Sequence, residues 1–139
     1  MKLVLASKNA HKLVEMRDIL SQLGVEVVLE SEVGVDVDVE ETGATFEENA
    51  FLKARAVMEA SGLPAIADDS GLCVDALNGA PGVYSARYGG PGLDDVGRYR
   101  LLLENMRGQL DRRCRFVSAI CCCFPNGDRV EARGLRIRH

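Results

Sequence analysis

The sequence has no long uninterrupted hydrophobic segment and no excess of positive charge. Its first twelve residues, MKLVLASKNAHK, contain too short an apolar run for a signal peptide, and no later segment is long enough to span a membrane. Its 17 basic residues stand against 21 acidic ones, a net charge of −4, whereas nucleic-acid polymers favour basic surfaces. We therefore expect a soluble cytoplasmic protein with neither a membrane nor a nucleic-acid polymer as partner. A small anionic ligand is compatible with this charge, because a few lysines and backbone N–H groups suffice to bind phosphate.

The five cysteines lack the CxxC spacing that is typical of zinc and redox motifs. They are Cys73, Cys114, Cys121, Cys122 and Cys123. Consecutive strand residues point to opposite faces, so the last three cannot converge on one metal ion. We interpret all five as small hydrophobic residues in a reducing compartment. The chain of 139 residues, 47% of them hydrophobic, has no repeat, low-complexity tract or linker, which predicts a single domain over residues 1–139.

An acidic pair directly follows a short apolar run in the middle of the chain. The residues Ala65–Ala67 predict a buried strand, which ends at Asp68 and Asp69 before Ser70 and Gly71. Ligands of α/β sheets usually bind at the carboxyl ends of strands, and a divalent cation would offset the repulsion between the two carboxylates. An Asp-Ser-Gly turn with solvated carboxylates is the alternative interpretation.

The N-terminal segment predicts a strand, a polar loop and a helix. Leu3–Ala6 forms the strand, and the helix after the loop buries Leu13, Met16, Leu20 and Leu23, widened by Ile19, and ends at Gly24. A loop at a helix N-terminus suits an anion, although an ordinary connecting loop is equally compatible with the spacing. The loop contains no glycine, which excludes a Walker loop and a dinucleotide fingerprint. Its residues are Ser7, Lys8, Asn9, Ala10, His11 and Lys12.

An acidic stretch and a second helix follow the predicted strand Val25–Leu29. The Val/Asp alternation over Val35–Val39 predicts a half-exposed edge strand, and most carboxylates from Glu30 to Glu41 are expected to be solvated. Glu40 and Glu41 are better site candidates, because they precede the turn Thr42-Gly43 and the helix. That helix begins with Thr45 as N-cap and Glu48 as its capping-box partner. Its inward face consists of Phe46, Ala50, Ala54 and Val57. Lys53 lies outside this face, and its spacing alone predicts an ordinary surface lysine.

The C-terminal half predicts further strands and one more helix. Leu72–Val74 is a separate strand, and a helix from about Asp94 to Met106 has an inward face of Val96, Tyr99, Leu103 and Met106. Arg115–Phe124 and Arg129–Ala132 form a hairpin around the turn 125–128. The fold class is therefore α/β, a central mixed sheet flanked by helices.

Five motifs in order along the chain resemble one family. They are Ser7-Lys8-Asn9-Ala10-His11-Lys12, Glu40-Glu41-Thr42-Gly43 with Thr45-Phe46-Glu47-Glu48-Asn49-Ala50, Lys53-Ala54, Ala67-Asp68-Asp69-Ser70-Gly71-Leu72, and Gly79-Ala80-Pro81-Gly82-Val83-Tyr84-Ser85-Ala86-Arg87-Tyr88. The chain is similar to the inosine/xanthosine triphosphate pyrophosphatase family, whose fold is related to that of the Maf proteins.

The resemblance implies Mg²⁺-dependent hydrolysis of dITP, ITP or XTP to the monophosphate and pyrophosphate by a homodimer. It implies Asp69 as proton acceptor with Asp68 in support, and Asp69 with Glu40 or Glu41 as metal ligands. The substrate would contact the loop from Ser7 to Lys12, together with Lys53 and Ser70.

The family's base-recognition motifs, Phe-Gly-Tyr-Asp and Ser-His-Arg, are absent from these 139 residues. The expectation is a C-terminally truncated domain, and a catalytically impaired nucleotide-binding fragment is the main alternative function. A Maf-type pyrophosphatase, whose corresponding loop has a Ser-Pro-Arg-Arg pattern, and an unrelated acidic metal-binding module are lesser alternatives.

The role of Asp69 generates a first prediction. Asp69→Asn removes the proton acceptor and one metal ligand while conserving the size of the side chain, so pyrophosphate release should be abolished and the fold retained. Near-normal pyrophosphate release by the folded variant would refute the assignment.

Overall fold

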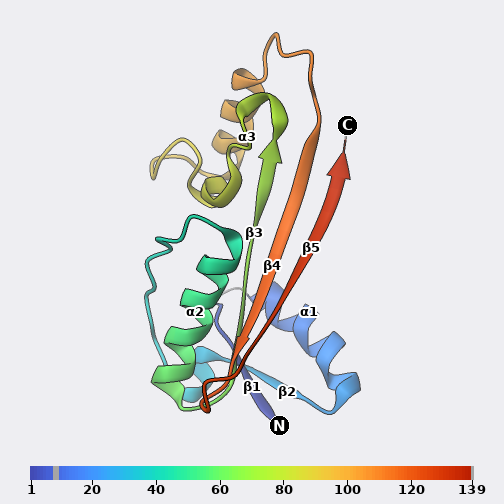
Figure 1. The fold of residues 1–139 in the computed structure, drawn as a ribbon. Coiled ribbons are helices and arrows are strands. Elements are labelled where there is room, and N and C mark those ends of the chain that lie inside the picture. The colour runs from blue at the N-terminus through green and yellow to red at the C-terminus, as the bar shows by residue number, and fades with distance from the viewer. Residues whose placement is uncertain (8–9, 139) are drawn as a thin grey trace. The chain divides into compact units, whose positions relative to one another are not determined.

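The computed structural model describes residues 1–7 and 10–138. A five-stranded sheet with the order β2-β1-β3-β4-β5 runs through it. Its strands are β1 (Lys2–Leu5), β2 (Glu26–Leu29), β3 (Ala65–Val74), β4 (Cys114–Cys123) and β5 (Arg129–Arg138), and its helices are α1 (Ala10–Leu20), α2 (Phe46–Ser61) and α3 (Asp95–Asn105) (Figure 1). The chain divides into two compact units: Met1–Asp69 with Ala119–Ala132, and Ser70–Ser118 with the segment from Arg133 onward. The single-domain expectation stays a prediction.

The first unit is a three-layer α/β/α arrangement. β1 pairs in parallel with β2 and with the start of β3, through Val4 opposite Ala65 and Leu5 opposite Ile66. Side chains alternate along β1, because successive strand residues point to opposite faces. Leu3 and Leu5 therefore pack with Leu13 of α1, whereas Val4 and Ala6 pack with the α2 residues Ala50, Ala54 and Val57.

Helix α2 begins where the capping box predicts. The Thr45 hydroxyl accepts a hydrogen bond from the Glu48 N–H at 3.1 Å, and Glu48 Oε2 accepts one from the Ala44 N–H at 2.8 Å. Its predicted inward residues Phe46, Ala50, Ala54 and Val57 are all buried.

Helix α1 begins at Ala10, so Lys12 belongs to its first turn rather than to the preceding loop. Leu13 is buried and Met16 and Leu20 pack beside it, but Ile19 and Leu23 are 62% and 74% exposed, so the predicted apolar stripe was too wide. Gly24 ends this segment with φ = 73°.

The predicted strand boundary at Asp68 was wrong. β3 continues without a break from Ala65 to Val74, which places Asp68 and Asp69 inside the strand and merges it with the predicted strand Leu72–Val74. The last bond from the end of β1 joins Ala6 N–H to Ile66 O at 2.8 Å. Asp68 and Asp69 therefore lie in the part of β3 that continues beyond the carboxyl end of β1. On the opposite edge of β3 its neighbour is β4.

The Val35–Val39 stretch forms no strand. Its burial alternates as predicted, with Val35 buried, Val37 and Val39 half-buried and both aspartates exposed, but no ladder of hydrogen bonds accompanies it. The alternation of valine and aspartate therefore indicates which side chains face the core, but it does not show that the segment pairs with another strand.

The C-terminal hairpin is present, and β5 extends beyond the predicted Ala132. Phe124 N–H donates to Asp128 O at 2.9 Å across the turn, and β4 and β5 run in opposite directions (Figure 1). Cys121 and Cys123 pack on the α2 side of the sheet and Cys122 on the α1 side, as the alternation argument required.

In the second unit, α3 begins after Asp94, whose carboxylate accepts the Gly97 N–H at 2.7 Å. Its predicted inward face was wrong: Met106 is buried, but Val96, Tyr99 and Leu103 are all more than half exposed.

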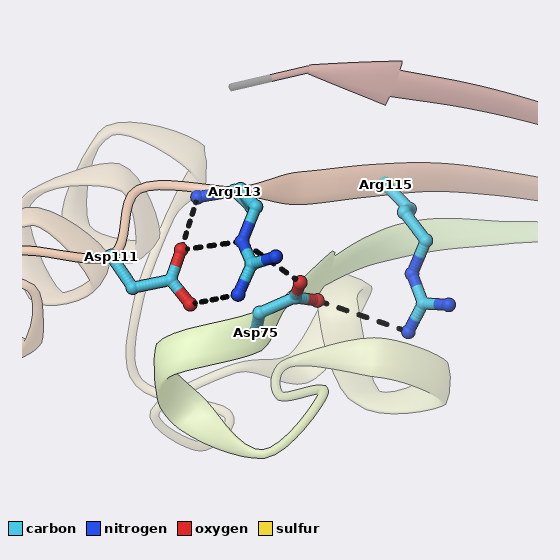
Figure 2. A network of polar contacts seen from close by, with 4 residues as sticks. All are labelled: Asp75, Asp111, Arg113 and Arg115. Carbon is cyan, nitrogen blue, oxygen red and sulfur yellow. Dashed lines mark hydrogen bonds and ion pairs between the residues drawn. The ribbon is translucent and has the colours of Figure 1, made fainter.

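An exposed ion-pair network lies at the start of β4 (Figure 2). Asp111 accepts two bonds of 2.9 Å from the Arg113 guanidinium, and Asp75 lies 3.8 Å from Arg113 and 3.9 Å from Arg115. The Asp111 carboxylate raises the pKa of Arg113, although pairs as exposed as this contribute little to stability. No helix among the described residues is long and apolar enough to cross a membrane.

The capping box predicts a measurable loss of stability in Thr45→Ala. Removing the hydroxyl leaves the Glu48 N–H without its acceptor, so the free energy of unfolding should fall by about 1 kcal/mol in urea denaturation. Thr42→Ala is the matched control, because no side-chain hydrogen bond of Thr42 is present among the described residues. Equal losses in the two variants would contradict a capping role.

Candidate functional site

The candidate site lies in the first unit, beyond the carboxyl end of β1. A cavity of about 260 Å³ opens there. It combines two lysines with several carboxylates, which suits a ligand that carries both phosphate groups and a cation. The lining residues are Ala6, Ser7, Lys12, Glu30, Val37, Asp38, Val39, Glu41, Lys53, Val57 and Asp68.

The predicted phosphate loop is only partly described. Ser7 lines the cavity and is half-buried, whereas Ala10 and His11 are exposed at the start of α1. Lys8 and Asn9 lie outside the described residues. The expected strand and helix lie on either side of this segment, and phosphate binding by it stays a prediction.

Lys12 is held by Asp68. Its ammonium donates to both carboxylate oxygens, at 2.8 and 2.9 Å, and the side chains of Lys12 and Asp68 are 35% and 17% exposed. This ion pair places an opposite charge against the Asp68 carboxylate within β3. Asp68 and Asp69 have different surroundings, because adjacent strand residues point to opposite faces of the sheet.

Asp69 is the more buried of the two carboxylates, at 8% exposure. Burial raises its pKa, and the charges of Glu41 and Asp68 raise it further, while Lys53 and the Asn49 amide lower it. Asp69 Oδ2 is buried without a hydrogen-bond partner among the described residues. A buried carboxylate oxygen with an unused lone pair is a suitable ligand for a hard cation or an acceptor for a water proton.

The structure separates the two predicted glutamate ligands. Glu41 Oε1 lies 3.4 Å from Lys53 Nζ, and both residues line the cavity. Glu40 is exposed, is absent from the cavity lining and forms no side-chain ion pair within the part of the chain that the structure describes. Lys53, which the spacing alone suggested was an ordinary surface residue, has a side chain only 20% exposed.

Sequence reasoning overlooked two polar residues of this region. Glu30 belongs to the stretch in which most carboxylates were expected to be solvated, but it is 5% exposed and lines the cavity. Its position immediately after β2 was the available signal. Asn49 is fully buried. It precedes Lys53 by four residues, so the two side chains share one face of α2, and this spacing was readable from the sequence.

Ser70 lies in the second unit, where it is half-buried. It lines a cavity of about 300 Å³ within that unit, together with Ser85, Tyr88, Arg98, Tyr99 and Phe116 among others. Its predicted contact with substrate stays a prediction.

Asp69 and Glu41 carry the hard carboxylate oxygens that Mg²⁺ prefers, but Asp69, unlike Asp68 and Glu41, is not among the residues that line the cavity. No group of three or more acidic, histidine or cysteine side chains positioned to hold a metal occurs among the described residues. Mg²⁺ does not require one, because it retains several waters and commonly binds one or two carboxylates plus substrate phosphates.

A family model described as "Ham1 family" matches residues 3–135. The chain is 46% identical to the dITP/XTP pyrophosphatase of an Exiguobacterium species over 96% of this chain and 68% of that protein. It is 55% identical to the dITP/XTP pyrophosphatase of Haemophilus influenzae over 86% of this chain and 62% of that one.

Solved structures agree with these relatives. A HAM1 protein from Coxiella burnetii superposes with a TM-score of 0.92 and 40% identity, over 99% of this chain and 71% of that chain. The Staphylococcus aureus Ham1 protein gives 0.90 and 42%, over 99% and 70%. The predicted family resemblance and α/β fold are thereby confirmed. The chain spans between 62% and 71% of the lengths of these four proteins.

The burial of Asp69 predicts that neutralising its charge stabilises the fold. Because the folded-state pKa of Asp69 is raised, its ionisation destabilises the fold, and this cost appears as the pH rises from the unfolded-state pKa through the folded-state pKa. In the absence of divalent ions at pH 8, Asp69→Asn should raise Tm by about 2–5 °C, and the gain should shrink as the pH is lowered.

Asp68→Asn is the matched control, since it removes the partner of Lys12 and relieves no comparable burial cost. Its Tm should stay level or fall. An equal rise in both variants would show that repulsion within the pair, rather than burial of Asp69, sets the cost.

Proposed function

This chain belongs to the Ham1 family, and from that membership we propose that it hydrolyses non-canonical purine nucleoside triphosphates, dITP, ITP and XTP, to the monophosphate and pyrophosphate. The observation that carries the proposal is the high identity to relatives named dITP/XTP pyrophosphatases, together with a cavity in which lysines and carboxylates converge. Removal of such nucleotides from the precursor pool is the corresponding role.

In this proposal the lysines bind the phosphates. Lys53 and Lys12 line the cavity already paired with Glu41 and Asp68, so each ammonium is oriented before substrate arrives. A triphosphate then competes with these carboxylates for the lysines. The N-terminal turn of α1 adds a partial positive charge to the same end of the cavity.

Asp69 acts as the proton acceptor. The oxygen of a water molecule bonds to the α-phosphorus, the bond from that phosphorus to the bridging oxygen breaks, and pyrophosphate leaves with the bond's electron pair. The water proton passes to the Asp69 carboxylate, whose raised pKa makes it a stronger base than an ordinary aspartate. Lys53 favours the ionised form that this step needs.

The proposed cofactor is Mg²⁺, with Asp69 and Glu41 as its protein ligands. When bound, it would neutralise charge on the phosphates. Glu41 is favoured over Glu40, because its charge acts on Asp69 and it lines the cavity. The cytoplasmic location, the homodimer and the absence of nucleic-acid polymer partners remain parts of the proposal.

Pyrophosphate release tests the function directly. With Mg²⁺, dITP and XTP should each be converted to equal amounts of the monophosphate and pyrophosphate. EDTA and Asp69→Asn should each abolish release.

Two outcomes would overturn the proposal. Orthophosphate in place of pyrophosphate would show cleavage at another bond. Tight binding of dITP with no release would instead support the alternative of a nucleotide-binding chain without turnover.

A further inference from the structure

Asn49 is a polar residue placed inside the apolar face of α2. Its side chain is 0% exposed, and its neighbours in the helix, Ala50, Ala54 and Val57, are core residues. A buried amide costs free energy unless both its acceptor and its donor find partners. The two ends of this amide have different surroundings.

The oxygen end of Asn49 holds the acidic loop. Asn49 Oδ1 accepts a hydrogen bond of 2.8 Å from the Gly43 N–H, directly after Glu41 and Thr42. Gly43 approaches the helix so closely that a Cβ at this position would lie 2.6 Å from Glu48 Cβ and 2.7 Å from Asn49 Oδ1. The bond therefore depends on glycine at residue 43, and it fixes the loop against the first turn of α2.

The nitrogen end of Asn49 has no such partner in the part of the chain that the structure describes. Asn49 Nδ2 and Asp69 Oδ2 are both buried without a partner of ordinary hydrogen-bond length among the described residues. Ala65 and Ala67 of β3 pack in one cluster with Ala50 and Ala54 of α2, and Asp69 lies on the same face of the strand as these alanines. The Asn49 amide also lowers the pKa of Asp69. The core between β3 and α2 thus contains two unsatisfied groups of complementary kind, one a donor and one an acceptor.

We propose that Asn49 is a positioning residue whose amide joins the Glu40–Gly43 loop to the Asp69 carboxylate, and so sets the spacing between Glu41 and Asp69 for a divalent cation. The cation part rests on the proposed function. Glu41 and Asp69 would hold the cation, and the amide is bonded to the loop that carries Glu41. Groups that orient metal-ligating carboxylates in this way commonly change metal affinity by 10–100-fold when removed.

Divalent-ion binding without nucleotide tests this role. Mn²⁺ serves as the probe, measured by the loss of its free-ion EPR signal. Asn49→Leu keeps the approximate volume but removes both ends of the amide, and should weaken Mn²⁺ binding at least about tenfold. In nucleotide hydrolysis with excess Mg²⁺ it should lower kcat by a similar factor and change KM less than about threefold.

Glu48→Ala is the matched control. It removes the second tether of the same loop, the 2.8 Å bond from Ala44 N–H to Glu48 Oε2, without contacting Asp69. Its Mn²⁺ affinity should stay within about threefold of the parent, even where its Tm falls as far as that of Asn49→Leu. Equal losses of Mn²⁺ affinity in the two variants would show that Asn49 only holds the loop in place, and would overturn the proposal.

A measurement on the unaltered residue keeps the test independent of whether Asn49→Leu folds. The side-chain ¹H–¹⁵N signals of Asn49 should shift when Mg²⁺ is added, and the shift should vanish in Asp69→Asn. No shift, or no Mn²⁺ binding at all, would overturn the proposal. A shift in a chain that releases no pyrophosphate would leave Asn49 in its positioning role while the proposed hydrolysis fails.

Discussion

The burial of the Asp69 carboxylate is the constraint around which the first unit is arranged. A charge placed between Ala67 and Gly71 in the middle of a strand loses its hydration, and the surrounding structure returns only part of that free energy. Lys53 supplies an opposite charge, and the Asn49 amide supplies a dipole. Because Glu41 and Asp68 act in the opposite sense, the region retains a shortage of positive charge. A bound divalent cation is the natural complement to such a deficit.

Helix α2 contributes residues both to the hydrophobic core and to the candidate site. One face packs Ala50, Ala54 and Val57 against the sheet, while its N-terminal turns hold the acidic loop through Thr45, Glu48 and Asn49 and present Lys53 one turn later. The loop itself forms no regular element, so its position depends on these bonds rather than on a sheet ladder. A perturbation of the first turns of α2 therefore reaches the glutamates directly, whereas one in its last turns does not.

Local signals were sufficient where the deciding interactions are local. The capping box at Thr45, the hairpin turn at residues 125–128 and the opposite orientation of Cys122 to its neighbours depend on residues within four positions of each other, and all were predicted. Predictions failed where a distant strand decides. β3 continues through Asp68 because β4 remains beside it, and the valines at 35–39 lack a strand to pair with. On α3, hydrophobic spacing alone did not identify which face packs.

The residue types of the site, its acidic pair, its glutamates, its lysines and the asparagine, were determined by the sequence, as was the family to which the chain belongs. Their ion pairs and their burial were decided by tertiary structure. Only the fold pairs Lys12 with Asp68 and Lys53 with Glu41, distinguishes Glu41 from Glu40, and buries both Asn49 and Asp69. The reason is physical: the pairing and pKa of an ionisable group depend on burial and on charges within a few ångströms, and here those neighbours lie up to 56 positions apart in the chain.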